Sequence, residues 1–143
     1  MEMKLELVPI PVTDVDRAKA FYTDQVGFTA DLDERFGESF RVVQLTPPGS
    51  ACSICIGVGI VETPPGSVQA LHLVVPDIHT ARADLLARGV EVSEVQDMSA
   101  PGKPTVSYAY FKDPDGNSWA LQQLPSEART SWAARLKSPT AHS

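Results

Sequence analysis

The hydrophobic pattern of this chain alternates between the spacing of a helix and that of a strand. Two apolar stripes recur at helical spacing, namely Val15, Ala18, Tyr22 and Ile78, Ala81, Leu85. The segments around them alternate apolar and polar residues with period two, which predicts strands. The predicted strands span residues 5–12, 28–34, 39–45 and 51–56, then 70–75, 90–95, 105–111 and 118–124. The pattern therefore predicts the order β-α-β-β-β twice.

Capping residues mark the ends of both predicted helices. Thr13 followed by Asp16 is typical of a capping box, and Asp77 is typical of an N-cap. Gly27 and Gly89 follow the helices, where we expect each to adopt the left-handed conformation that ends a helix.

An internal repeat relates the two halves of the chain. Residues 12–20 resemble residues 75–83 at an offset of 63 positions. We therefore predict one domain, residues 1–124, built from two matched modules, 4–61 and 69–124. The tail, residues 125–143, lies outside the repeat and is predicted to form a short helix that then frays. This helix would either pack on the outside of a sheet or act as a lid or dimer contact.

Turn-forming residues separate the predicted strands. The segment Asp-Pro-Asp-Gly-Asn at 113–117 predicts a hairpin between the last two strands, because Pro114 presets φ and Gly116 accepts a positive φ. Thr-Pro-Pro-Gly-Ser occurs at 46–50, predicted as a hairpin turn, and at 63–67, predicted as the linker between modules. Residues 96–104 are predicted to be a loop, either a flap over a pocket or a plain surface loop.

Composition and charge narrow the function classes. The 143 residues are 43% hydrophobic and 21% charged, as in a soluble globular domain, and the formal net charge is −6. An acidic chain without a basic cluster is not expected to bind nucleic acid or an anionic membrane. Neither a signal peptide nor an apolar run of ~18 residues is recognisable, which predicts a cytoplasmic protein without a membrane span.

The cysteines form a Cys-x-x-Cys spacing, at Cys52 and Cys55. Redox chemistry usually needs a helix N-terminus after the first cysteine, whereas this segment is predicted to be a strand. On a strand, residues three apart point to opposite faces. We therefore expect two separate, reduced, buried thiols.

Two motifs resemble those of a known superfamily. Pro-Val-Thr-Asp-Val-Asp-Arg-Ala-Lys-Ala-Phe-Tyr at 11–22, followed by Val-Gly-Phe at 26–28, resembles the first-module signature of the vicinal oxygen chelate superfamily. Phe-Lys-Asp-Pro-Asp-Gly-Asn-Ser-Trp at 111–119 resembles its final hairpin. The superfamily includes glyoxalase I, bleomycin-resistance proteins and extradiol dioxygenases. The resemblance implies an α+β fold, in which two tandem β-α-β-β-β modules form a cup-shaped, mixed-sheet half-barrel with the ligand in its concave face.

The metal-ligand positions of the superfamily are occupied by unsuitable residues. The resemblance places these positions at Leu7, Ala70 and Ala120, with Ser53 or else Cys55 as the fourth. Leu and Ala side chains cannot coordinate a metal. We therefore expect no cofactor, and a bound divalent metal is the disfavoured alternative.

His72 is a side chain near these positions that could coordinate a metal, and its role is left open. It follows Ala70 by two residues and is expected on the same strand face. It is either a metal ligand, a polar residue of the cup, or a histidine without a ligand role. Alternation predicts which residues line the concave face. They are Leu7, Pro9, Ser53, Cys55, Ala70, His72, Ser118, Ala120 and Gln122.

Three functions follow from this site. The favoured one is a metal-independent protein that binds a small, partly apolar organic molecule in its cup. The second is an enzyme, a lyase, isomerase or dioxygenase of the superfamily type, either metal-free with His72 as a catalytic acid-base or metal-dependent. The third is a partner-binding module whose concavity is filled by side chains. The resemblance also implies a homodimer whose modules complete or abut the cups.

Overall fold

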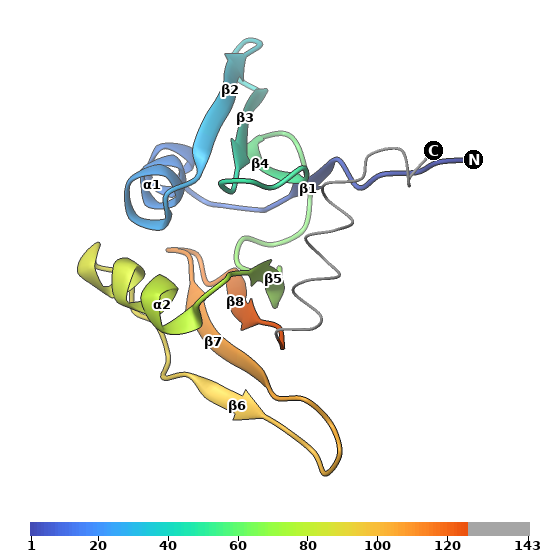
Figure 1. Cartoon of the computed structure of the whole chain (residues 1–143). Helices are drawn as coiled ribbons and strands as arrows, with labels where there is room; N and C mark the ends of the chain where they lie inside the picture. The colour runs from blue at the N-terminus through green and yellow to red at the C-terminus, as the bar shows by residue number, and fades with distance from the viewer. Residues whose placement is uncertain (126–143) are drawn as a thin grey trace.

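The computed structural model describes residues 1–125, which form two four-stranded sheets and their helices (Figure 1). The first module contains β1 (Leu7–Pro9), α1 (Val15–Ala20), η1 (Phe21–Val26), β2 (Thr29–Arg35), β3 (Arg41–Thr46) and β4 (Ser53–Val58). The second contains β5 (Leu71–Val74), α2 (Ile78–Ala87), β6 (Gln96–Met98), β7 (Val106–Lys112) and β8 (Ser118–Gln123). The tail beyond residue 125 lies outside the described residues, so the helix expected there stays a prediction.

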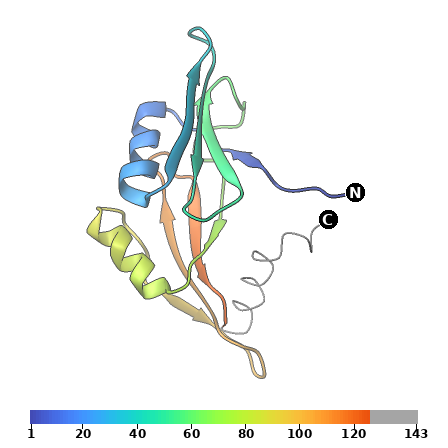
Figure 2. The same cartoon turned by 45° about the horizontal axis from the view of Figure 1, so that its top comes forward.

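The two sheets have the same topology. Sheet A has the order β1-β4-β3-β2, and sheet B has the order β5-β8-β7-β6. In each, the first strand of the module pairs in parallel with the last, and the other pairs are antiparallel. Helices α1 and α2 lie on the same side of the molecule, so the opposite face of each sheet carries no helix among residues 1–125 (Figure 2). The repeat predicted the two matched β-α-β-β-β modules, and the open, mixed-sheet α+β fold is the one that the resemblance implied.

The prediction of a strand at residues 90–95 is wrong. Residues 90–95 form no strand, and β6 instead lies in the segment predicted as the 96–104 loop. The alternation was real, because Val90 and Val92 are buried in the core. Only Ser93 bonds with the neighbouring strand there, its N–H donating to the Tyr110 carbonyl at 2.9 Å. Burial of every second side chain is therefore not enough to make a strand without a continuous hydrogen-bond ladder.

The helix ends combine one wrong prediction with three correct ones. The capping box at Thr13 is wrong, because Asp14 is the N-cap and its carboxylate accepts from the Arg17 N–H at 3.0 Å. Asp77 caps α2 as expected, accepting from the N–H groups of two following residues. Gly27 and Gly89 have φ values of 96° and 87°, as predicted for residues that end helices. After Ala20 the first helix widens into the π-helical turn η1.

A single hydrophobic core joins the two modules. Tyr22 of η1 packs edge-on against Trp119 of β8, with ring centroids 5.8 Å apart. Phe28 contacts the same indole at 5.6 Å, and Phe21 lies 6.5 Å from Phe111 of β7. The helical segment of module one therefore packs on the sheet of module two, and neither module buries its aromatic residues alone.

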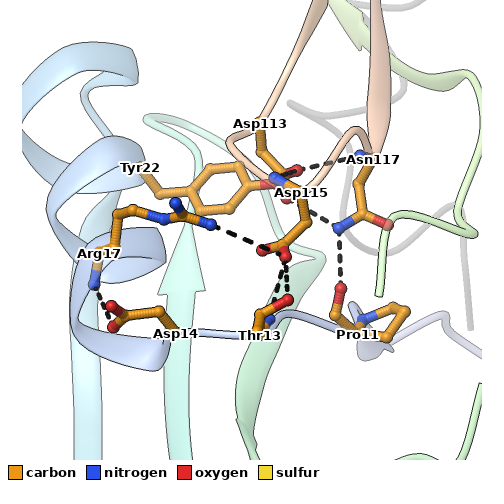
Figure 3. Close-up of polar contacts among 8 residues, drawn as sticks. All are labelled: Pro11, Thr13, Asp14, Arg17, Tyr22, Asp113, Asp115 and Asn117. Carbon is orange, nitrogen blue, oxygen red and sulfur yellow. Dashed lines mark hydrogen bonds and ion pairs between the residues drawn. The ribbon is translucent and has the colours of Figure 1, made fainter. Parts of the chain in front are cut away.

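A buried polar network joins the modules beside this core (Figure 3). Asn117, fully buried in the β7–β8 hairpin, donates to the Pro11 carbonyl at 2.9 Å and to Asp113 at 2.8 Å. The Tyr22 hydroxyl donates to the same aspartate at 2.8 Å. Asp115 accepts from the N–H and hydroxyl of Thr13 at the start of the first helix. The predicted hairpin is confirmed, and its polar side chains fix the entry to α1.

Candidate functional site

The helix-free face of sheet A carries the four module-one residues predicted to line the cup. Leu7 pairs with Ser53, and Pro9 pairs with Cys55, so each pair points to one face. Ile54, between them on β4, belongs to the core on the other face. The predicted alternation is therefore what the structure shows for β1 and β4.

Module one also places a polar cluster on this face that the sequence analysis missed. The Ser53 hydroxyl lies 2.6 Å from the Thr46 hydroxyl and accepts from the Gln44 amide at 3.3 Å. Thr46 also bonds with the carboxylate of Asp31 on β2. The period-two pattern of β3, with Val43 and Leu45 in the core, was the signal that could have placed Gln44 and Thr46 here.

The helix-free face of sheet B is aromatic and polar. Register places Tyr110 opposite Ala120, and Tyr108 opposite Gln122. The two tyrosine rings stack at 6.4 Å with an interplanar angle of 8°. The Gln122 amide donates to the Tyr108 hydroxyl at 3.2 Å. The sequence left open which face of the strand carries Tyr108 and Tyr110. The structure places both on the helix-free face of sheet B.

His72 lies on the same face of sheet B, opposite Ala120. Its ring meets the Tyr108 ring edge-on, with centroids 5.9 Å apart, and its side chain is exposed. His72, Ala120, Gln122 and the two tyrosines therefore form one cluster, which we call the sheet B cluster.

Ala70 departs from the prediction. It precedes β5 instead of belonging to it, and its φ of +59° is in the left-handed region. The face argument from strand alternation therefore does not apply to Ala70. Its N–H donates to the hydroxyl of Ser118 at 2.7 Å, so these two predicted site residues are in direct contact.

The hollows on the surface show which predicted residues come together. A hollow of about 330 Å³ is lined by residues 47–52 of module one and by His72, Leu73 and Val74 of module two. Another, of about 540 Å³, is lined by residues 91–93 and 110–113 together with Ser118. Neither is lined by Leu7, Pro9, Ser53 or Cys55. The structure therefore divides the predicted site into two faces and brings His72 beside the 47–52 loop.

The two cysteines are free thiols, Cys55 buried and Cys52 half-buried. Burial raises the pKa of both thiols above the ordinary value, and the negative charge of Glu6 adds to the effect at Cys52. A raised thiol pKa disfavours the thiolate, which is the reactive form. The cysteines are therefore poor candidates for nucleophilic or redox chemistry.

The side chains at the superfamily's metal-ligand positions are not suited to coordinate a metal ion. Leu7 and Ala120 have no ligating side-chain atom, and the Ser53 hydroxyl is engaged by Thr46. Within residues 1–125, no group of three or more His, Cys, Asp or Glu side chains is arranged to hold a metal ion.

Comparison with known proteins agrees with the fold described above. The model of the Glyoxalase/Bleomycin resistance protein/Dioxygenase superfamily matches residues 4–121. The chain belongs to this superfamily. No curated protein matches it. Across residues 1–125, no helix of this superfamily member is long and apolar enough to cross a membrane.

Solved structures from the superfamily resemble the chain over most of its length. TnmS3, an antibiotic-binding protein from Streptomyces sp. CB03234, is 34% identical, with a TM-score of 0.70 over 87% of this chain and 97% of its own. A glyoxalase/bleomycin resistance protein from the same organism is 33% identical, with a TM-score of 0.67 over 84% and 100%. A superfamily member from Sphaerobacter thermophilus DSM 20745 is 27% identical, with a TM-score of 0.70 over 85% and 98%.

Proposed function

We propose that this chain binds a small, partly apolar organic molecule on the helix-free faces of its sheets, without a metal and without converting it. The observation that carries the proposal is the sheet B cluster. Two stacked tyrosine rings, an imidazole and an amide surround the small side chain of Ala120. Apolar and aromatic surface with a few directed polar groups is the usual composition of a small-molecule site.

Exposure of the aromatic residues supports a ligand. Tyr110 is 42% exposed although its ring stacks on Tyr108. A planar group lying against this pair would remove apolar surface from water and gain a favourable ring contact. The antibiotic-binding description of the 34% identical TnmS3 supports the same class of ligand for this chain.

Metal independence is supported by the residues at the superfamily's ligand positions. Leu7 and Ala120 replace donors with hydrocarbon, and the remaining polar side chain, Ser53, bonds with its neighbours. We propose that these apolar positions enlarge the apolar part of the binding face.

We further propose that the chain is a cytoplasmic homodimer. Both sheets leave one face without a helix among residues 1–125 (Figure 2). A second copy that brings one such face opposite another would enclose the ligand from two sides and remove exposed apolar surface from water. The mass of the protein in solution tests the dimer.

Native mass spectrometry of the EDTA-treated protein with a panel of aromatic antibiotics tests binding. We expect at least one compound to bind at one molecule per chain, and to be recovered with its mass unchanged. Tyr110→Ala should weaken that binding about tenfold, because the ring contact is lost. Phe36→Ala is the matched control, since Phe36 is also an exposed aromatic residue but lies between β2 and β3.

Three results would contradict the proposal. They are failure of every compound to bind, binding only after a divalent metal is added, and release of a chemically altered product. Equal weakening by the two variants would place the ligand elsewhere than on the sheet B cluster.

A further inference from the structure

The backbone just before β5 is held in an unusual conformation. Within residues 1–125, Ala70 is the only non-glycine residue with a positive φ, +59°. A side chain on the α-carbon makes this conformation unfavourable, so it persists only where the surroundings hold it. Such outliers gather at sites of function, which makes the contacts of Ala70 informative.

Ser118, the first residue of β8, holds Ala70 in place. Its hydroxyl accepts from the Ala70 N–H at 2.7 Å and donates to the Gln69 side-chain oxygen at 3.0 Å. The Ser118 N–H also donates to the carbonyl of Val68 at 3.0 Å. Residues 68–70 are therefore attached to β8 at three points, and the direction of the Ala70 carbonyl follows.

That carbonyl meets the imidazole of His72. The Ala70 oxygen lies 2.7 Å from His72 Nδ1. A carbonyl oxygen can only accept a hydrogen bond, so Nδ1 must carry the proton. In a neutral imidazole the lone pair then belongs to Nε2. Among the described residues, no group forms a hydrogen bond with Nε2.

We infer that Ser118 and Ala70 are positioning residues that hold neutral His72 as the Nδ1–H tautomer, so that Nε2 accepts a hydrogen bond from an O–H or N–H group of the ligand. This inference rests on the proposed function for its ligand, but the tautomer does not depend on it. The His72 ring lies beside the Tyr108 ring, and His72 lines the hollow shared with the 47–52 loop. The ligand class is accordingly an aromatic molecule with a phenolic or similar donor.

The tautomer is measured directly in the free protein. Two-bond ¹H–¹⁵N correlation spectra, followed to the alkaline end of a titration, distinguish a protonated from an unprotonated ring nitrogen. We expect the neutral His72 ring to be protonated at Nδ1. His79, which is exposed on α2, serves as a reference in the same spectrum. Protonation of His72 at Nε2 in the neutral form would overturn the inference.

Substitutions at Ser118 and Ala70 test whether these residues position the His72 ring. Ser118→Ala and Ala70→Val should both shift His72 toward the Nε2–H form, because one removes the hydroxyl and the other disfavours a positive φ. Ala70→Gly should retain the Nδ1–H signature, since glycine adopts this conformation freely. Ser107→Ala is the matched serine control, as Ser107 bonds with Asp97 on the other side of sheet B. If all of these variants keep the wild-type spectrum, Ser118 and Ala70 do not position His72.

A matched pair of probes tests the ligand class. 2-Naphthol carries the donor, whereas 2-methoxynaphthalene lacks it. We expect the wild type to bind 2-naphthol about five- to tenfold more tightly, as one net hydrogen bond predicts, and His72→Phe to lose this preference. Equal binding of the probes, a preference that survives in His72→Phe, or binding of neither probe would each overturn the ligand class. The antibiotic panel decides the proposed function separately.

Discussion

Tyr22 shows how a single side chain couples the modules. Its hydroxyl donates to Asp113 at 2.8 Å and accepts from the Trp119 indole at 3.0 Å, and it is fully buried. Burial raises the pKa of Tyr22 far above its ordinary value, and the negative charge of Asp113 raises it further. The phenol therefore stays protonated in the folded protein well into the alkaline range.

Tyr22→Phe should lower the free energy of unfolding by about 1–3 kcal/mol at neutral pH, because the Trp119 N–H loses its acceptor and Asp113 a donor. Urea denaturation measures this. The unfolded chain releases its tyrosine proton above about pH 10, whereas folded Tyr22 keeps its own. Wild-type stability should therefore fall as the pH rises past that value, and the gap to Tyr22→Phe should narrow.

The control is Tyr110→Phe, since Tyr110 is 42% exposed whereas Tyr22 is fully buried. This variant should change stability little at neutral pH. A gap between wild type and Tyr22→Phe that stays constant from pH 8 to about 11 would contradict the raised pKa.

Individual residues also show where the sequence analysis was incomplete. Thr13 has the spacing of a capping residue, but it bonds with Asp115, which is 102 positions away. Ala70 resembles an ordinary strand residue, but Ser118 holds it in a left-handed conformation. In both cases the deciding partner is distant in the sequence, so local spacing does not reveal it.

At the scale of elements, the close approach of β3 and β4 imposes a strict requirement. Gly57 lies opposite Val42, and a β-carbon at Gly57 would stand 1.8 Å from the carbonyl oxygen of Arg41. Arg41 is itself held by Asp16 of α1 and Asp33 of β2, at 2.8 Å from each. The backbone there cannot move away without breaking ion pairs to two other elements.

Gly57→Ala should therefore destabilise the protein by about 2–4 kcal/mol, as backbone displacement in a packed region does. Gly49→Ala is the control, because its φ is +80° but no atom lies within 4 Å of the added carbon. It should cost about 1 kcal/mol, from strain alone. Thermal unfolding of both variants checks this, and a Gly57→Ala loss no larger than that of Gly49→Ala would contradict the close approach.

Most strands were predictable from the sequence, and the short edge strand β6 was not. Strands β2, β3, β4, β5, β7 and β8 lie within about two residues of the prediction, and β2 and β5 are themselves edge strands. The short edge strand β6 was misplaced, since exposed residues such as Gln96 and Met98 have no hydrophobic alternation.

At the scale of the whole molecule, the proposed dimer gives a direct prediction. Light scattering at micromolar concentration should report twice the 15.4 kDa mass of the chain. The physical reason is the uncovered face of each sheet, where residues such as Tyr110 remain 42% exposed. A mass of one chain, unchanged on raising the concentration, would contradict the dimer.

The two β-α-β-β-β modules follow from the order of residues along the chain. Their repeat, the capping Asp77, the glycines that end both helices and the 113–117 hairpin depend on local preferences of a few adjacent residues. Strand alternation also placed Ser53 and Cys55 on the face opposite Ile54, because period two is a property of any strand.

Tertiary structure alone decided which of these pieces meet. It divided the predicted site between two sheets, placed Tyr108 and Tyr110 on the face of His72, and brought the 47–52 loop beside that histidine. It also joined Ser118 to Ala70 across 48 positions, which sets the proton on the imidazole. These relations are distances between residues far apart in the chain, and local sequence preferences carry no information about such distances.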